Sequence, residues 1–207
     1  MRLDRLLLVR GYFSSRERAK LAIRLGKVLV NGRAVKKPSA QVEPGAEVEV
    51  LSREAPRGYW KLAELDREWG IFSGPEVVLD LGSSAGGFLM YAGERASLVV
   101  GIEYSRDFEA ALREIERSRK NVRIYIADAF TFDTSVLPEL DLILVDLTLP
   151  PRDALLAMRR FLGKLRPGGR VLFVAKGRGK PDFTGLRLLR SRRSPSRRES
   201  YFLLEKP

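Results

Sequence analysis

The chain has 207 residues and a formal net charge of +12; 44% of its residues are hydrophobic and 31% are charged. That length permits one large domain or two small ones, and the composition is typical of a folded globular protein rather than a disordered one. Cysteine and histidine are both absent, which excludes disulfides, thiolate or imidazole zinc sites, cysteine nucleophiles and histidine general bases. We therefore expect no metal, and any proton transfer must fall to Lys, Asp, Glu or Tyr.

The positive charge is concentrated in two blocks. Residues 1–37 contain eleven Lys and Arg against two acids, residues 176–207 contain ten against three, and the stretch between them is slightly acidic. Two basic blocks indicate a polyanionic partner, with a basic surface kept for solubility as the alternative. The apolar run of residues 6–9 is too short for a signal peptide or a membrane span, so we expect a cytoplasmic protein with no membrane contact.

The first part of the chain predicts a small α+β domain. A capping box of Ser14 and Glu17 begins its second helix, and Asn31-Gly32 is a typical hairpin turn. The expected helices, hairpin and further strand cover residues 2–11, 14–26, 27–35 and 46–51.

Three runs within these residues resemble the small RNA-binding domain named after ribosomal protein S-four. They are Arg-Leu-Asp-Arg-Leu-Leu from residue 2, Ser-Arg-Glu-Arg-Ala from residue 15, and Gly-Lys-Val-Leu-Val-Asn-Gly-Arg-Ala-Val-Lys-Lys-Pro from residue 26. Two basic helices beside a hairpin also suit recognition of structured RNA by shape. The resemblance implies RNA contacts by Arg2, Arg5, Ser15, Arg16, Lys20, Arg24, Lys27, Asn31 and Arg33.

We expect residues 1–52 to form this domain, residues 53–57 a linker, and residues 58–207 a larger α/β domain. A helix over residues 59–69 begins the second domain, and strands and helices then alternate, which predicts a mostly parallel, covered sheet. The expected strands are residues 77–80, 98–103, 122–128, 140–146, 171–176, 186–190 and 200–204. Helices are expected at residues 108–119 and 152–165, with a turn at Arg166-Pro-Gly-Gly-Arg.

The stretch Val77–Phe88 is the main nucleotide-site signal. An apolar strand ends in Asp80, and a loop with Gly82, Gly86 and Gly87 follows directly. The spacing is neither the dinucleotide fingerprint nor a phosphate loop, so it favours a pocket for a nucleoside without phosphates, such as that of S-adenosylmethionine (SAM). A tight strand-to-helix turn with no ligand is the alternative.

Further charged residues end the following strands, at the edge where such sheets bind ligands. Glu103 lies about twenty residues past the glycine loop, where an acid can accept hydrogen bonds from a ribose. Asp128 could accept from an adenine amino group, with Phe130 packed on the ring. Asp146 and Lys176 end the next two strands.

This second domain resembles the FtsJ-type ribose 2′-O-methyltransferases. The matching runs are Tyr-Trp-Lys-Leu-Ala-Glu-Leu-Asp from residue 59, the glycine loop, Asp-Leu-Ile-Leu-Val-Asp from residue 141, Val-Ala-Lys from residue 174, and Ser-Arg-Arg-Glu-Ser-Tyr from residue 196. The resemblance implies a Rossmann-like SAM methyltransferase sheet of seven strands, the last antiparallel, and a catalytic tetrad. The tetrad falls on Lys61, Asp146, Lys176 and Glu199. The expected cofactor residues are Asp80, Gly82, Ser83, Ser84, Gly86, Gly87, Phe88, Glu103, Asp128, Ala129, Phe130 and Asp146.

A ribose 2′-hydroxyl must lose its proton as it attacks the methyl group. A lysine made neutral by a neighbouring cation and partial burial can act as the base, which we assign to Lys176 with Lys61 as its neighbour. Asp146 would orient the ammonium groups and the hydroxyl, and Glu199 would anchor Lys61 or the substrate.

Both domains together resemble the TlyA (hemolysin A-like) family of ribosomal RNA 2′-O-methyltransferases, with three local departures. Pro-Arg-Gly-Tyr-Trp precedes Lys61 in place of Ser-Arg-Gly-Gly, Leu-Thr-Leu follows Asp146 in place of Val-Ser-Phe, and an arginine-enriched loop follows Lys176. The resemblance implies SAM-dependent 2′-O-methylation of structured RNA, with ribosomal RNA as the expected target. Cytosine-C5 and uracil-C5 methylation need a cysteine that the chain lacks. The alternatives are another base methyltransferase and an RNA-binding or ribosome-assembly factor with an inactive methyltransferase domain.

Overall fold

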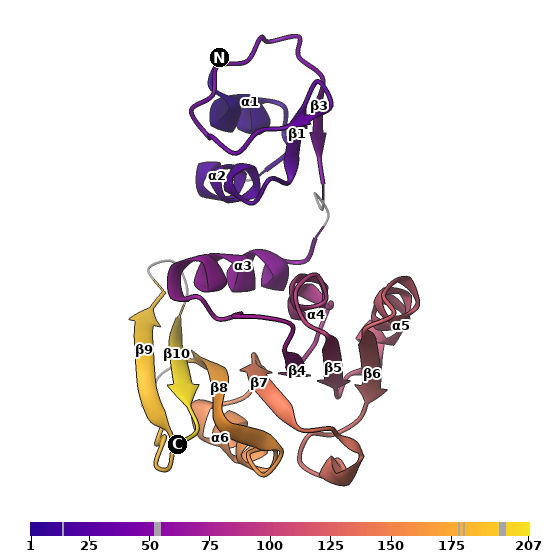
Figure 1. The fold of residues 1–207 in the computed structure, drawn as a ribbon, viewed down its shortest axis with the longest axis vertical. Helices are drawn as coiled ribbons and strands as arrows, with labels where there is room; N and C mark the ends of the chain where they lie inside the picture. Colours follow the sequence, from indigo (N-terminus) through magenta and orange to yellow (C-terminus); the bar gives the residue numbers. More distant parts are fainter. Residues whose placement is uncertain (14, 52–54, 178, 180, 195–197) are drawn as a thin grey trace. The chain divides into compact units, whose positions relative to one another are not determined.

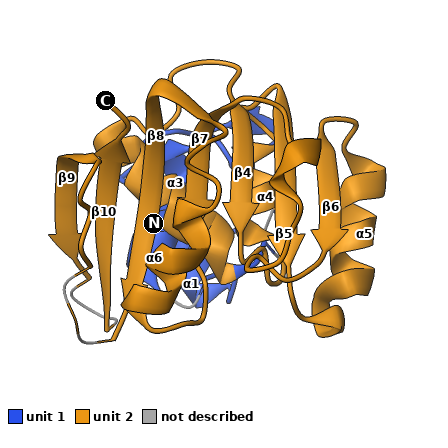
Figure 2. Cartoon of the chain, turned by 90° about the horizontal axis from the view of Figure 1, so that it is seen from below, with its two compact units in different colours: residues 1–56 blue, residues 57–207 orange. Residues whose placement is uncertain are grey.

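The computed structural model describes the whole chain except residues 14, 52–54, 178, 180 and 195–197 (Figure 1). The described chain divides into two compact units, residues 1–56 and 57–207, shown in separate colours in Figure 2. Residues 53 and 54 of the expected linker lie outside the described residues, and the unit boundary follows Pro56.

Unit 1 packs two helices against a three-stranded antiparallel sheet of order β2-β1-β3. Most buried side chains at its centre are aliphatic, including Leu3, Leu7 and Ile23, each with no exposed surface. Apolar residues at helical spacing therefore form the core of this small unit. Its elements are α1 (Leu3–Val9), α2 (Arg16–Arg24), β1 (Val28–Val30), β2 (Arg33–Ala34) and β3 (Val48–Val50).

The cap of α2 differs from the expected one. Ser14 lies outside the described residues, and Ser15 occupies the N-cap position, where its side-chain oxygen accepts from the Arg18 backbone N–H at 3.4 Å. Glu17 pairs with Lys20 at 2.7 Å. Glycine at residue 11 follows α1 with a φ of 70°, the left-handed conformation expected after a helix.

Unit 2 is built on a seven-stranded sheet of order β6-β5-β4-β7-β8-β10-β9. The strands from β6 to β8 are parallel, and β10 runs antiparallel to both β8 and β9. The Rossmann-like methyltransferase fold with an antiparallel last strand is thereby confirmed. The strands are β4 (Val77–Leu81), β5 (Leu98–Glu103), β6 (Val122–Ile126), β7 (Leu140–Val145), β8 (Leu165–Lys176), β9 (Arg187–Arg193) and β10 (Glu199–Glu205).

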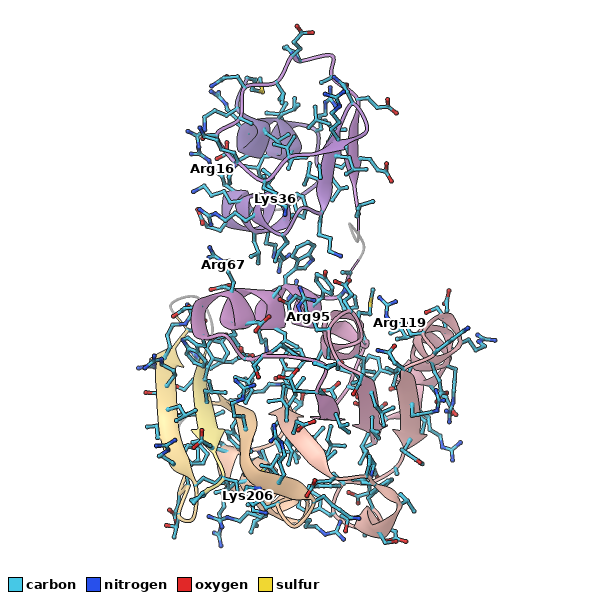
Figure 3. The ribbon with its side chains drawn as sticks, in the orientation of Figure 1. Arg16, Lys36, Arg67, Arg95, Arg119 and Lys206 are labelled. Carbon is cyan, nitrogen blue, oxygen red and sulfur yellow. The ribbon has the colours of Figure 1, made fainter. Side chains whose placement is uncertain are left out.

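Helices cover both faces of this sheet. Figures 1 and 2 show α3 (Arg57–Trp69), α4 (Gly87–Ala92) and α5 (Glu109–Ser118) on one face and α6 (Pro151–Arg159) on the other. On the first face, Tyr91 donates to Asp66 at 2.9 Å, and the guanidinium of Arg95 stacks 3.5 Å from the Tyr91 ring (Figure 3). These contacts join α4 to α3. Two short 3-10 helices, η1 (Arg106–Phe108) and η2 (Thr134–Val136), lie in the loops.

Two expected boundaries in the second half were wrong. The helix expected over residues 152–165 ends at Arg159, and Arg166-Pro-Gly-Gly-Arg lies inside β8 rather than in a turn before it. The register moves from Leu140 opposite Leu165 to Leu142 opposite Arg170, so the extra residues form a bulge. Pairing to the end of the chain explains the strand: Gly168 donates to the carbonyl of Lys206, and Lys206 donates to that of Gly169.

Candidate active site

The expected site residues gather at one edge of the sheet, around β4. The chain passes from β4 outward to β5 and β6, then returns to β7 on the other side of β4. Such a switch point leaves a crevice beyond the carboxyl ends of the strands. The loops after β4 and β7 meet there, since a side chain on Gly82 would lie 3.2 Å from the Asp146 carbonyl oxygen.

The structure brings the four tetrad residues into contact. Lys61, on α3, donates to the Asp146 carboxylate at 2.8 Å and to Glu199 at 3.3 Å. Lys176 lies 3.1 Å from the other Asp146 oxygen. Side-chain exposure is 9% for Lys61 and 28% for Lys176, so the second lysine is the more open to a substrate. Asp146 therefore joins two ammonium groups from residues that lie far apart in the sequence.

Strand register sets this geometry. Lys176 is the last residue of β8 and lies directly opposite Glu199, the first residue of β10. Residues opposite each other in a ladder project to the same face, which here is the face covered by α3. Lys61 on α3 therefore reaches Glu199 across the helix–sheet interface.

Two further polar residues, which the sequence did not single out, hold tetrad members. Thr148, just after β7, accepts from the Lys176 ammonium at 3.2 Å. Tyr201 donates to Glu199 at 3.0 Å, and burial together with the Glu199 charge raises the pKa of its hydroxyl, which keeps it a donor. Their positions in the sequence could have pointed to them, because Thr148 lies two residues after Asp146 and Tyr201 lies two residues after Glu199.

Asp80 is a buried carboxylate with no hydrogen-bond partner among the described residues. It has no exposed surface, and neither carboxylate oxygen finds a donor. Burial raises its pKa to about 8; the nearby Ser83 hydroxyl opposes this effect, and the charges of Asp146 and Glu103 add to it. A buried acid left without a donor at the end of the central strand is the kind of group that a cationic ligand would pair with.

Glu103 and Asp128 are held by backbone amides. Glu103 accepts from the N–H of Ser84 at 2.7 Å through one oxygen and from that of Ser105 at 2.8 Å through the other. Asp128 accepts from the Phe130 N–H at 2.8 Å. Each carboxylate oxygen keeps a lone pair, so both acids are fixed in place and can still accept from a ligand.

Exposed aromatic rings follow both acids. Tyr104 is 77% exposed directly after Glu103, and Phe130 is 42% exposed two residues after Asp128. Phe130 was expected at a nucleobase, whereas Tyr104 was missed. Large exposed rings beside acids that can accept from sugars and amines are typical of nucleoside sites.

Two of the expected cofactor glycines serve packing. A side-chain carbon on Gly86, whose φ is 79°, would lie 2.1 Å from the Ile115 side chain on α5. One on Gly87 would lie 2.5 Å from the Tyr59 backbone nitrogen on α3. These glycines thus let α4 approach α3 and α5. Phe88 is buried as well.

In unit 1, five of the nine expected RNA contacts fall into two groups. Ser15 caps α2, and the Asn31 side chain accepts from the Glu47 N–H at 3.0 Å, so these two polar groups have structural partners. By contrast, three arginines are exposed without an ion pair to any described residue: Arg5, Arg24 and Arg33.

Asp4, a residue the sequence did not single out, holds two of the expected RNA-binding arginines. Its fully buried carboxylate lies 3.0 Å from both Arg2 and Arg16, which are about half exposed; Arg16 is labelled in Figure 3. The hydrogen bond from Arg2 lowers the pKa of Asp4 to about 2, with Arg16 adding to the effect. Asp4 fixes the direction in which both guanidinium groups project.

We expect Asp4→Asn to destabilise unit 1 by about 1–3 kcal/mol at neutral pH, because the charged partner of both arginines is lost. The folded pKa lies below the unfolded value of 3.8, so this stabilisation is present above pH 4 and disappears as the pH falls toward 2. Hydrogen exchange of the α1 and α2 amides measures it. Glu17→Gln, which removes an exposed carboxylate from the same unit, serves as the control; equal exchange in the two variants would contradict a special role for Asp4.

Family models match both units. Residues 1–48 match the S4 domain and residues 55–176 match the FtsJ-like methyltransferases. The chain belongs to the FtsJ-like methyltransferase family. The resemblances found in the sequence are confirmed.

Among the relatives of this FtsJ-like chain is a protein of Bacillus subtilis named "Putative rRNA methyltransferase YqxC". The two are 31% identical over 158 residues, which cover 72% of this chain and 56% of that protein. A "Ribosomal RNA small subunit methyltransferase A" of Rubrobacter xylanophilus is 40% identical over 62 residues, 30% of this chain and 24% of that one. The chain thus spans little more than half of the first of these relatives.

Solved structures share the fold. A "Putative hemolysin" from Streptococcus thermophilus superposes with a TM-score of 0.60 over 100% of this chain and 88% of its own, at 20% identity. Fibrillarin of Aeropyrum pernix, crystallised with S-adenosylmethionine, gives a TM-score of 0.61 over 78% of this chain and 80% of its own, at 18% identity.

The cofactor of this FtsJ-like methyltransferase is S-adenosylmethionine, and the crevice fits it. The fit rests on the unpartnered Asp80 carboxylate, on the free lone pairs of Glu103 and Asp128, and on the exposed rings beside them. Within the described ranges, no three His, Cys, Asp or Glu side chains gather as a metal site, and no helix is long and apolar enough to cross a bilayer.

Proposed function

We propose that the chain is an RNA ribose 2′-O-methyltransferase that acts on structured ribosomal RNA. The observation that carries the proposal is the contact of Lys61, Asp146, Lys176 and Glu199 at the sheet edge next to Asp80. An S4 domain and relatives named as rRNA methyltransferases support RNA as the acceptor. The absence of cysteine leaves no nucleophile for C5 methylation of pyrimidines.

In this proposal the cofactor lies along the ends of β4, β5 and β6. Asp80 pairs with its positive charge, Glu103 accepts from the ribose hydroxyls, and Asp128 accepts from the adenine amino group. Tyr104 and Phe130 pack on the base. When bound, S-adenosylmethionine supplies an activated methyl group, so the protein's main task is alignment of the acceptor oxygen.

The tetrad would prepare that acceptor oxygen. Lys176 is the more exposed lysine and takes the 2′-hydroxyl proton as general base, which requires its neutral form. Lys61 bridges Asp146 and Glu199, and through Asp146 it shares a partner with Lys176. Asp146 and Thr148 fix the direction of the Lys176 nitrogen.

Product analysis tests the proposal. The enzyme and tritium-labelled S-adenosylmethionine are incubated with ribosomal RNA and with isolated ribosomal subunits, and the RNA is digested to nucleosides. We expect the label in 2′-O-methylnucleosides. Label in a methylated base would show that the enzyme is a base methyltransferase and would contradict ribose methylation. If the protein binds the cofactor but transfers no label to any of these acceptors, the result would favour an RNA-binding assembly factor.

A further inference from the structure

The outermost strand of the unit 2 sheet, β9, is strongly basic. Its sequence Arg-Leu-Leu-Arg-Ser-Arg-Arg contains four arginines and no acid in seven residues. Among the described strands it pairs only with β10, which leaves its other edge open. This strand belongs to the C-terminal basic block, for which the tetrad and the cofactor residues give no explanation.

Two of the four arginines are bound within the domain. Arg192 lies 2.6 Å from Glu68 and 3.0 Å from Glu64, both on α3, and Arg187 pairs with Glu205 on β10. The other two, Arg190 and Arg193, are exposed and have no ion pair within the described part of the chain. An unpaired exposed guanidinium is available to a phosphate.

The end of β9 and the start of β10 lie beside the tetrad. Lys176 lies opposite Glu199, and the Ser194 N–H donates to the Glu199 carbonyl at 2.9 Å. Lys176, Glu199 and Ser194 therefore form one row of neighbouring residues across the sheet. Strand spacing places Ser194, next to Arg193, about 10 Å from Lys176. Arg198 is also exposed, and its carbonyl accepts from the N–H of Gly177 at 2.8 Å. Arg193 lies opposite Ser200 and Arg190 opposite Leu203, so the two side chains project to opposite faces of the sheet, one on each side of its outer edge. Arg193 and Arg198 lie at the end of the sheet where Lys176 ends β8.

Protection of an open edge does not account for this charge. Cations on edge strands do prevent pairing with other chains. The opposite edge strand of the same sheet, β6, reads Val-Arg-Ile-Tyr-Ile and needs the same protection with Arg123 as its one cation. The additional arginines are on β9, the edge strand on the same side of the sheet as the tetrad strands β8 and β10.

We propose that Arg190, Arg193 and Arg198 form a cationic edge that binds the phosphate backbone of the substrate RNA and leads it to Lys176. The inference rests on the proposed function and adds a second RNA contact surface, on the methyltransferase unit itself. Its contacts are to phosphates, so it positions the strand without reading its sequence.

The test uses the full-length protein and a short fluorescent single-stranded RNA of mixed sequence. We expect R190Q/R193Q to weaken binding about tenfold and to reduce the slope of log affinity against log salt by about 1.4, the value for two lost phosphate contacts on a single strand. R190K/R193K keeps the charge and should bind within about twofold of the unmodified protein. The control R123Q removes the exposed cation of the opposite edge and should change neither quantity.

Cofactor affinity, measured on each variant, shows that the domain remains folded. An unchanged affinity and salt slope in R190Q/R193Q, or an equal loss in R123Q, would overturn the proposal; self-association of R190Q/R193Q without loss of RNA binding would assign these arginines to edge protection. RNA binding is measured without methyl transfer. Failure here is therefore separate from failure of the proposed function, which is judged from the methylated product.

Discussion

We expect Lys176→Met to lower the rate of methyl transfer by about 10²–10⁴-fold, the usual contribution of a general base, and to leave the affinity for S-adenosylmethionine within a few-fold of the unmodified protein. The reason is that Lys176 is the tetrad lysine open to a substrate, whereas Lys61 lies between two carboxylates. Single-turnover transfer to ribosomal RNA measures the rate, and equilibrium titration measures the affinity.

Lys176→Arg separates two roles of this residue. Arginine keeps the positive charge but does not deprotonate in proteins, so it cannot accept the hydroxyl proton. We expect the arginine variant to be as inactive as the methionine variant. Substantial activity with arginine would show that charge alone is required and remove the base role. Lys120→Met, on the exposed turn before β6, is the matched control and should leave the rate unchanged.

Ionisation of Asp80 is expected to govern cofactor affinity. Its pKa is raised to about 8 by burial, so below pH 8 the unbound protein holds this carboxyl protonated. A cationic ligand pairs with the carboxylate and must displace that proton. We therefore expect the association constant for S-adenosylmethionine to rise about tenfold per pH unit from pH 6 to pH 8 and to level off above.

Asp80→Asn is the control for this pH dependence. Asparagine keeps the shape of the side chain without its ionisation, so any remaining slope belongs to the ligand's own titration. We expect the variant to bind more weakly at pH 8 and to lose most of the slope, as followed by titration calorimetry. Equal slopes in both proteins would contradict a role for the Asp80 carboxylate in binding.

The same group affects the stability of the protein without cofactor. The folded pKa of about 8 exceeds the unfolded value of 3.8, so between these values the folded state holds a proton that the unfolded chain releases. Stability therefore falls as the pH rises from 4 to 8. Asp80→Asn should raise the melting temperature at pH 8, because the buried Asp80 carboxyl lowers the stability of the unbound protein at that pH. Such a loss of stability is common where a buried charged group serves function.

The arrangement of the larger unit was predictable because its strands are apolar runs of strand length, separated by helical periodicity. Predicted element boundaries were wrong where strand pairing with a distant part of the chain determined the structure. Arg166-Pro-Gly-Gly-Arg has every feature of a turn, yet it joins β8 because Gly168 and Gly169 pair with Lys206 at the end of the chain. No local pattern encodes that partner.

Site residues divide in the same way. Asp80, Glu103 and Asp146 were predicted as site residues because they lie at or next to the carboxyl ends of β4, β5 and β7, and parallel strands end at one edge of the sheet. Asp4 and Tyr104 were missed because a lone acid in a short helix and a lone ring in a loop have many uses. The contacts of Asp4 with Arg2 and Arg16 appear only after the unit folds.

By itself, the sequence determined the family, the strand-end acids around the crevice and the two basic blocks, because each is encoded in order and spacing along the chain. Only the tertiary structure decided which charges are free and which are bound. Lys61 and Glu199 are separated by most of the second unit and meet through the register of β8 and β10. Long-range pairing likewise leaves Arg190 and Arg193 exposed while Glu64 and Glu68 bind Arg192.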